Sequence, residues 1–167
     1  MKSVLISIKP KWCELIASGK KTVEVRKTRP KLDVPFKCYI YCTKGKTIYH
    51  PRDIFGNEAL NGKVIGEFVC DKVVQFENHC YNPAFEETAD LSCVGFEGLY
   101  YYLGLNDYGY GWHISDLVIY DKPKKLSEFI KPCNHDNDCC TCDRYDYIGH
   151  KCYNEVTRPP QSWCYVE

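Results

Sequence analysis

The chain has 167 residues and a formal net charge of zero, because 22 Lys and Arg balance 22 Asp and Glu. This length suits one domain, or one domain with an insertion, that is large enough to bury a core. No apolar run reaches the length of about 18 residues that a membrane span needs, and the first residues lack the apolar region of a signal peptide. We therefore expect a cytoplasmic protein.

The charge is spread unevenly along the chain. Residues 1–52 carry 13 Lys and Arg against 3 Asp and Glu, so the remainder carries the acidic excess. A basic half suits a polyanionic partner such as nucleic acid. Scattered, solvated lysines are the alternative.

The first elements are a strand and a short helix. Apolar residues alternate over positions 4–8, which predicts a strand. Residues 10–18 suit a helix, because Pro10 is tolerated in a first turn and Gly19 follows the last turn, where a left-handed residue is favoured. Trp12 lies on the apolar face of this helix.

A dense group of charges follows the helix. Residues 22–26 alternate with a period of two, so Thr22, Glu24 and Arg26 project to one side of a predicted strand and two valines to the other. Lys21 lies in the turn before it, and the nearby Arg26 is expected to lower its pKa. The charges form either an ion pair on a solvated sheet face, worth at most about 1 kcal/mol, or a site for a ligand with donors and acceptors.

The motif G-x-K-x-x-E-x-R is filled here by Gly19, Lys21, Glu24 and Arg26. Together with the preceding strand and the helix that begins at Lys9-Pro10-Lys11-Trp12, it resembles the signature of the ASCH family in the PUA-like superfamily. Residues 111–120 also resemble the last long strand of such domains, so the resemblance covers roughly residues 3–130. It implies a small β-barrel with a cleft near the motif that is used for RNA or nucleotide-like ligands.

The resemblance also carries two possible activities. Some small family members hydrolyse the acetyl group of acetylated cytidine, and others are reported or proposed to cleave RNA. In the acetylcytidine hydrolases a lysine that matches Lys21 is catalytic, but a threonine occupies the place of Glu24. This departure counts against the same chemistry here.

The rest of the chain reads as strand-rich, which makes the fold class α+β. Gly66 lies within a long predicted strand and indicates a bulge or a close backbone approach. We expect Ser127 to cap a short helical turn. The expected elements are strands at 37–43, 63–76 and 112–120, a loop or flap over the cleft at 44–61, a loop or short helix at 78–95, a helix at 96–105 and a helical turn at 126–129.

Aromatic side chains are abundant, with 14 Tyr, 7 Phe and 3 Trp, and three of the tyrosines are consecutive at 100–102. Aromatic faces near basic groups can stack unpaired bases for about 1–3 kcal/mol each. Trp12 and Trp112 are the candidates for this role because both lie on segments that resemble the family. A place in the core is the alternative for each.

The chain has 12 cysteines, five of which fall between positions 133 and 152. Cys133, Cys139, Cys142 and Cys152 could form a tetrahedral thiolate site for a structural zinc ion. Free thiols or redox-active pairs are the alternatives. The cysteines at positions 13, 38, 42 and 70 read as small buried hydrophobes.

The carboxyl-terminal residues 158–167 are strand-like after two prolines. They either close the barrel or bring Arg158, Gln161 and Trp163 to the cleft. The expected organisation is a barrel at residues 1–130, a cysteine-rich insertion at 131–157 and a closing strand at 158–167.

Two functional classes remain, with a protein-interaction domain as a third. In a binding module, Lys21 and Arg26 would hold a phosphate or a base edge of single-stranded RNA, a nucleoside or a nucleotide, and Glu24 would accept from an exocyclic amine. Outside the carboxyl-terminal segment, the other candidate ligand-binding residues are Lys9, Thr22, Trp12 and Trp112. In a hydrolase, Lys21 would stabilise an oxyanion and Glu24 would act as a general base. Apart from zinc, no cofactor is expected.

Overall fold

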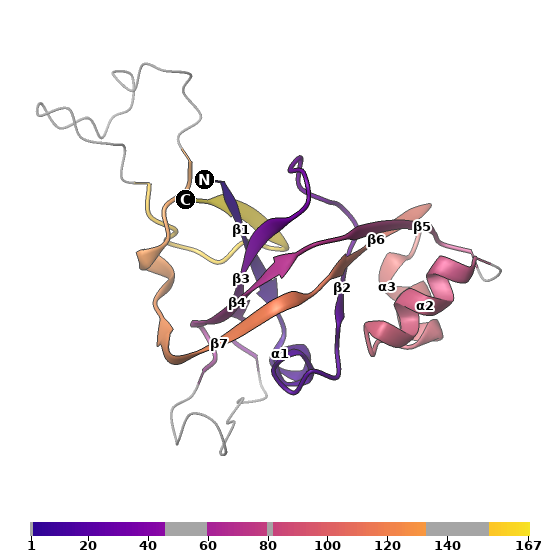
Figure 1. Cartoon of the computed structure of the whole chain (residues 1–167), viewed down its shortest axis with the longest axis horizontal. Helices are drawn as coiled ribbons and strands as arrows, with labels where there is room; N and C mark the ends of the chain where they lie inside the picture. Colours follow the sequence, from indigo (N-terminus) through magenta and orange to yellow (C-terminus); the bar gives the residue numbers. More distant parts are fainter. Residues whose placement is uncertain (1, 46–59, 80–81, 133–153) are drawn as a thin grey trace, which may run out of the picture.

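A computed structural model describes residues 2–45, 60–79, 82–132 and 154–167. Two sheets form its framework (Figure 1). The larger has the strand order β7-β4-β3-β1-β8, and the smaller has the order β2-β6-β5. The strands are β1 (Ser3–Ile8), β2 (Val23–Arg26), β3 (Phe36–Cys42), β4 (Val64–Cys70), β5 (Val73–Glu77), β6 (Tyr108–His113), β7 (Ser115–Lys124) and β8 (Trp163–Val166).

All neighbouring strands are antiparallel except β1 and β3, which are parallel. The expected closed barrel is not found. In the described part of the chain β8 pairs with β1 and β7 pairs with β4, so these two strands are the edges of the larger sheet. The prediction that the carboxyl-terminal strand closes a barrel is therefore wrong, because this strand extends one edge and does not meet the other.

Within the described residues three helices pack against the sheets: α1 (Pro10–Ala17), α2 (Pro83–Leu91) and α3 (Phe96–Leu103). Helix α1 begins at a proline and is followed by Gly19 at a φ of 72°, as its sequence indicates. The Asn82 side chain caps α2 by accepting hydrogen bonds from the Ala84 and Phe85 amides. The 3-10 turn η1 (Leu126–Glu128) begins after Lys125 rather than at the predicted cap Ser127.

Two long segments are each divided between the sheets, one at the predicted strand 63–76 and the other around the predicted strand 112–120. Residues 63–76 form β4 in the larger sheet and β5 in the smaller one, and residues 108–124 form β6 and β7 in the same way. The break between β6 and β7 lies at Ile114, whose amide donates to the Thr22 carbonyl (2.9 Å). This division places the motif strand β2 in the smaller sheet, against β6.

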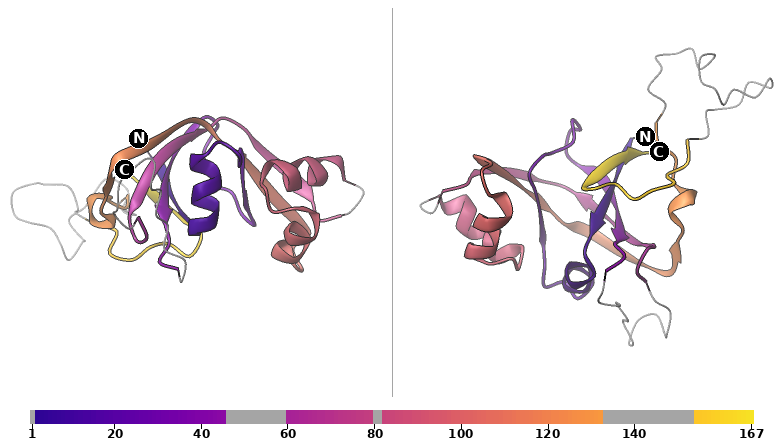
Figure 2. Two further views of the ribbon diagram at one scale, coloured as in Figure 1. Left: turned by 90° about the horizontal axis from the view of Figure 1, so that it is seen from below. Right: turned by 180° about the vertical axis from the view of Figure 1, so that it is seen from behind.

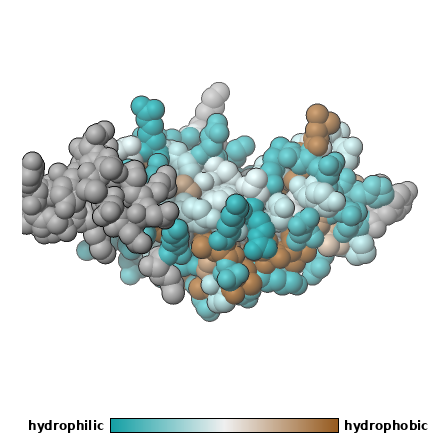
Figure 3. All heavy atoms as spheres, turned by 90° about the horizontal axis from the view of Figure 1, so that it is seen from above, coloured by the Kyte–Doolittle hydropathy of each residue, from teal (hydrophilic) through white to brown (hydrophobic). Residues whose placement is uncertain are grey.

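The main core lies between the larger sheet and α1, and it also takes in Trp112 from the smaller sheet. Helices α2 and α3 cover the smaller sheet through a second apolar cluster that includes Val25, Phe76 and Phe85. Figure 2 shows these two helices gathered at one end of the molecule, away from the termini. The face in Figure 3 is largely hydrophilic, with a hydrophobic band along one edge.

No helix in the described residues is long and apolar enough to cross a membrane.

Candidate functional site

Both faces of strand β2 are covered, so its charged side chains are shielded from solvent. Val25 packs under α2 and α3, while Glu24 and Arg26 line a cavity on the other side. Only 4% of Glu24 and 8% of Arg26 is exposed. The alternative of an ion pair on a solvated sheet face is therefore wrong.

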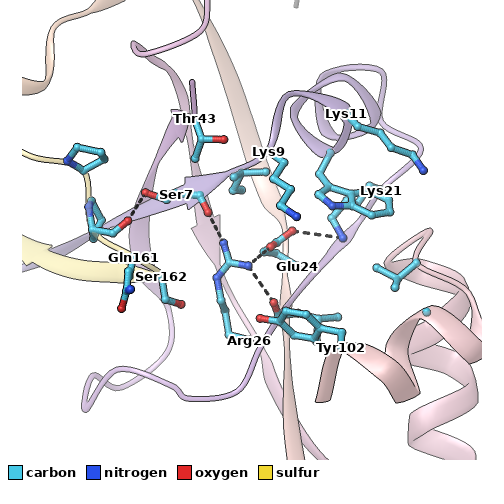
Figure 4. Close-up of a pocket in the computed structure, with 17 residues that line it drawn as sticks. Ser7, Lys9, Lys11, Lys21, Glu24, Arg26, Thr43, Tyr102, Gln161 and Ser162 are labelled. Carbon is cyan, nitrogen blue, oxygen red and sulfur yellow. Dashed lines mark hydrogen bonds and ion pairs between the residues drawn. The ribbon is translucent and has the colours of Figure 1, made fainter. Parts of the chain in front are cut away.

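Glu24 lies between two cations (Figure 4). Its Oε2 atom is 3.3 Å from Lys21 Nζ, and its Oε1 atom accepts a short hydrogen bond from Arg26 Nη1. Arg26 Nη1 also donates to its neighbour's carbonyl, that of Val25, at 3.0 Å. Arg26 Nη2 donates to the Ser7 carbonyl of β1 at 2.6 Å. The guanidinium is thus fixed to two strands.

Lys21 contacts the connection between α2 and α3 as well as helix α1. Its ammonium donates to the Ser92 carbonyl (2.7 Å), in the connection between α2 and α3. It also lies 5.2 Å from the centre of the Trp12 ring. Burial lowers the pKa of Lys21, and the Glu24 carboxylate opposes that shift. The expected direction is correct, but burial is the main cause and the charge of Arg26 contributes least.

The cavity has a volume of about 610 Å³ and is built from segments far apart in the sequence. Helix α1 contributes Lys11 and Trp12, and the connection before it contributes Lys9. Helix α3 contributes Gly98 and Tyr102. A volume of this size is within the range of about 300–1,000 Å³ that is typical of small-molecule sites.

Residues 159–162 form a further wall before β8. Ser7 fixes this segment, because its hydroxyl donates to the Pro160 carbonyl (2.7 Å) and its amide donates to the Ser162 carbonyl (2.9 Å). The Ser7 carbonyl also accepts from Arg26. The carboxyl-terminal segment is therefore tied to the motif through one residue, and Gln161 faces the cavity (Figure 4).

Of the predicted site residues, Lys9, Trp12, Lys21, Glu24 and Arg26 line the cavity. Others lie elsewhere. Thr22 and Arg158 are exposed outside the cavity wall.

Trp112 and Trp163 were expected to contact the ligand, but neither lines the cavity. Trp112 is fully buried and packs edge-on against Phe36, with ring centres 5.7 Å apart, so no base can stack on it. Trp163 packs against Trp112, and its indole nitrogen donates to the Thr28 hydroxyl (3.1 Å). Both side chains form part of the packing behind the cavity.

Ser7, Gly98 and Tyr102 line the cavity but were not among the candidates. The sequence contained a partial indication of Tyr102, because the three consecutive tyrosines at 100–102 stand out. Its position four residues after Gly98 puts both on one helix face, but which face meets the cavity depends on how α3 packs.

The four predicted zinc ligands, Cys133, Cys139, Cys142 and Cys152, lie outside the described residues, and so does most of the predicted flap. The zinc site thus stays a prediction. Within the described ranges no group of three or more His, Cys, Asp and Glu side chains is placed to hold a metal. The cysteines at positions 13, 38, 42 and 70 are buried with free thiols, as expected.

Comparison with known proteins places the chain among a group with the same fold. The sequence profile of the ASCH domain matches residues 6–120. No curated protein matches the chain. A crystal structure of ASCH from Zymomonas mobilis superposes with a TM-score of 0.63 at 18% identity, covering 99% of this chain and 87% of that one. A mutant of the same protein superposes with a TM-score of 0.60 at 18% identity, covering 100% and 91% of the two chains. At this identity the likeness shows a shared fold.

Proposed function

Because the chain belongs to the ASCH domain family, whose members generally bind RNA, we propose that the cavity beside β2 binds a base of single-stranded RNA or of a nucleotide-like ligand. The observation that carries the proposal is the wall formed by Lys21, Glu24 and Arg26. It combines a carboxylate acceptor and two cationic donors in a cavity of about 610 Å³.

The hydrogen bonding of this wall is incomplete. Arg26 Nε is buried and has no hydrogen-bond partner among the described residues, and Glu24 Oε2, which forms an ion pair with Lys21 Nζ at 3.3 Å, accepts no hydrogen bond from them. A buried polar atom without a partner costs about 1–3 kcal/mol. A base edge presents amine donors beside carbonyl acceptors, so a small shift of these side chains toward such an edge would satisfy both atoms.

Aromatic rings complete the recognition that we propose. Trp12 and Tyr102 both line the cavity, from α1 and α3 respectively. An aromatic ring stacked on a base contributes about 1–3 kcal/mol and tolerates any base. In this arrangement the polar wall selects the base edge while the rings contribute affinity.

The experiment is a calorimetric titration with the four ribonucleosides and with a short single-stranded oligoribonucleotide. Glu24→Gln keeps the shape of the side chain but removes its charge and half of its acceptors. We expect it to weaken binding about 10- to 100-fold, as for loss of a hydrogen bond to a charged group. The matched control is Glu67→Gln, because Glu67 pairs with Lys37 at 2.7 Å away from the cavity.

Two outcomes would contradict the proposal. One is that none of these ligands binds. The other is that Glu24→Gln binds as the parent does. If Glu24→Gln instead loses several kcal/mol of unfolding free energy, the charges are a structural brace, and Trp12→Leu then tests whether the cavity binds a base.

A second candidate, hydrolysis of RNA or of an acylated nucleoside, is favoured by the lowered pKa of Lys21. A lysine that loses its proton more readily is a better base or nucleophile. Glu24, flanked by two cations, is poorly placed to act as a general base. Mass spectrometry of RNA and acylated cytidines incubated with the protein decides the matter, because turnover that disappears in Lys21→Ala would identify an enzyme.

A further inference from the structure

Two lysine–aromatic pairs flank the cavity beside the proposed base site. Lys11 Nζ lies 4.7 Å from the centre of the Trp12 ring, and Lys27 Nζ lies 5.5 Å from the centre of the Tyr102 ring. Both rings line the cavity, but they belong to different walls, Trp12 to α1 and Tyr102 to α3. Figure 4 shows Lys11 and Tyr102 on separate sides of the Glu24–Arg26 pair.

The ammonium groups of both pairs are available to an anion. Lys11 and Lys27 are exposed, and neither forms an ion pair with a described residue. This contrasts with Lys21, which is buried and bound to Glu24 and to the Ser92 carbonyl. The buried and exposed lysines therefore have different roles: Lys21 belongs to the wall, while the outer two can bind charge from solvent.

The charge of the surrounding elements agrees with an anionic partner. Lys9 and Lys20 are exposed at the two ends of α1. The nearest acidic positions on these helices are Glu14 on α1 and Glu97 on α3, and neither lines the cavity. An ammonium is a compact, strongly hydrated charge that suits a phosphate, and an adjacent ring can stack a base at the same time.

We infer that the site takes a nucleotide from within a single strand, with its base in the cavity and its two flanking phosphates on Lys11 and Lys27. This rests on the proposed function, which assigns the base to the cavity. It adds that the ligand is recognised as a chain with a phosphate on both sides rather than as a free nucleoside. Trp12 and Tyr102 keep the stacking role proposed above, and each lies beside the lysine that holds a phosphate.

The test compares four ligands with the same base: cytidine, its 5′-monophosphate, its 3′-monophosphate and its 3′,5′-bisphosphate. We expect each phosphate to tighten binding at least about fivefold at low salt, as for one charge-assisted hydrogen bond. The bisphosphate should therefore bind most tightly. The same series with adenosine shows whether the gain is independent of the base.

Variants assign the two phosphates to the two lysines. Lys11→Gln should remove most of the gain from one phosphate, and Lys27→Gln should remove most of the gain from the other. The matched control is Lys122→Gln, an exposed lysine of β7 outside the cavity, which changes the net charge equally. With a trinucleotide, each of the first two variants should lower the slope of log affinity against log salt by about 0.7.

The outcomes separate this inference from the function on which it rests. If cytidine binds but its phosphates add nothing, or if Lys122→Gln lowers the gain as much as Lys27→Gln does, the inference is overturned and the base site stands. If both lysine variants remove the gain from the same phosphate, the assignment of two sides is wrong. If neither the nucleosides nor the bisphosphates bind, the base site and the inference both fail.

Discussion

Lys21 is a charged group that the fold buries to 2% exposure, and its titration is coupled to stability. Burial lowers its pKa, so the folded chain holds this proton less tightly than the unfolded chain does. Stability is therefore reduced below the folded-state pKa and rises as the pH climbs toward the ordinary lysine value of about 10.4. Between about pH 7 and pH 10, we expect the unfolding free energy of the parent protein to rise relative to that of Lys21→Met.

Urea unfolding of both proteins across this range measures the effect. Lys122→Met is the control, because it makes the same substitution at an exposed lysine. If the unfolding free energy of the parent instead falls relative to that of Lys21→Met as the pH rises, pairing with Glu24 outweighs burial. The pKa of Lys21 is then raised in the folded state.

At the scale of an element, β4 depends on a close approach at Gly66. The register between β4 and its two neighbours shifts at or beside this residue. A Cβ atom added there would lie 2.4 Å from the Val118 carbonyl oxygen of β7, where the contact is with backbone and cannot be relieved by a rotamer change. The sequence-based expectation of a bulge or close approach at this residue is confirmed.

We therefore expect Gly66→Val to destabilise the protein by about 1–3 kcal/mol, measured as the free energy of unfolding in urea. Gly98→Ala in α3 is the control. Its Cβ would meet only a methyl group of Val94 at 3.0 Å, and alanine is favoured over glycine in a helix. Equal stability of Gly66→Val and the parent would mean that β4 and β7 separate easily.

At the scale of the whole molecule, Trp112 connects the two sheets. It lies on β6 of the smaller sheet but is fully buried in the core of the larger one, against Phe36 of β3 and Trp163 of β8. Truncation of such a side chain costs about 3–5 kcal/mol. We expect Trp112→Ala to lose this much, and Val118→Ala, at a half-exposed position, to lose under about 0.5 kcal/mol.

Because this core spans both sheets, we also expect the parent protein to unfold in one cooperative step. Urea transitions followed by tryptophan fluorescence and by far-ultraviolet circular dichroism should coincide. Two separate transitions would show that the smaller sheet, with α2 and α3, is an independent unit and that Trp112 does not couple it to the rest.

Several features could be predicted because they depend on neighbours in the chain. The strand predicted at 4–8, the helix that begins at Pro10 and the turn at Gly19 follow from periodicity and from the conformational preferences of proline and glycine. A helix predicted at 96–105 is present as α3 and ends two residues earlier, at Leu103. Short loops join these elements, so the motif's Lys21, Glu24 and Arg26 were predicted together as a group.

Other features depend on contacts between distant positions. The pattern of residues along the chain does not predict such contacts. The predicted strands at 63–76 and 112–120 each read as continuous, and only the pairing between these two regions shows where the chain passes from one sheet to the other. Trp112 was a stacking candidate and Tyr102 was not, yet packing buries the first and leaves the second at the cavity.

The sequence by itself determined the ASCH motif, its place after a strand and helix, and the basic character of the first 52 residues. The tertiary structure decided what those charges do. Lys21 donates to a carbonyl 71 positions away, and Ser7, which accepts from Arg26, donates to a carbonyl 153 positions beyond itself. Solvation and partners set the behaviour of a charged group, and both come from residues that only the folded chain brings together.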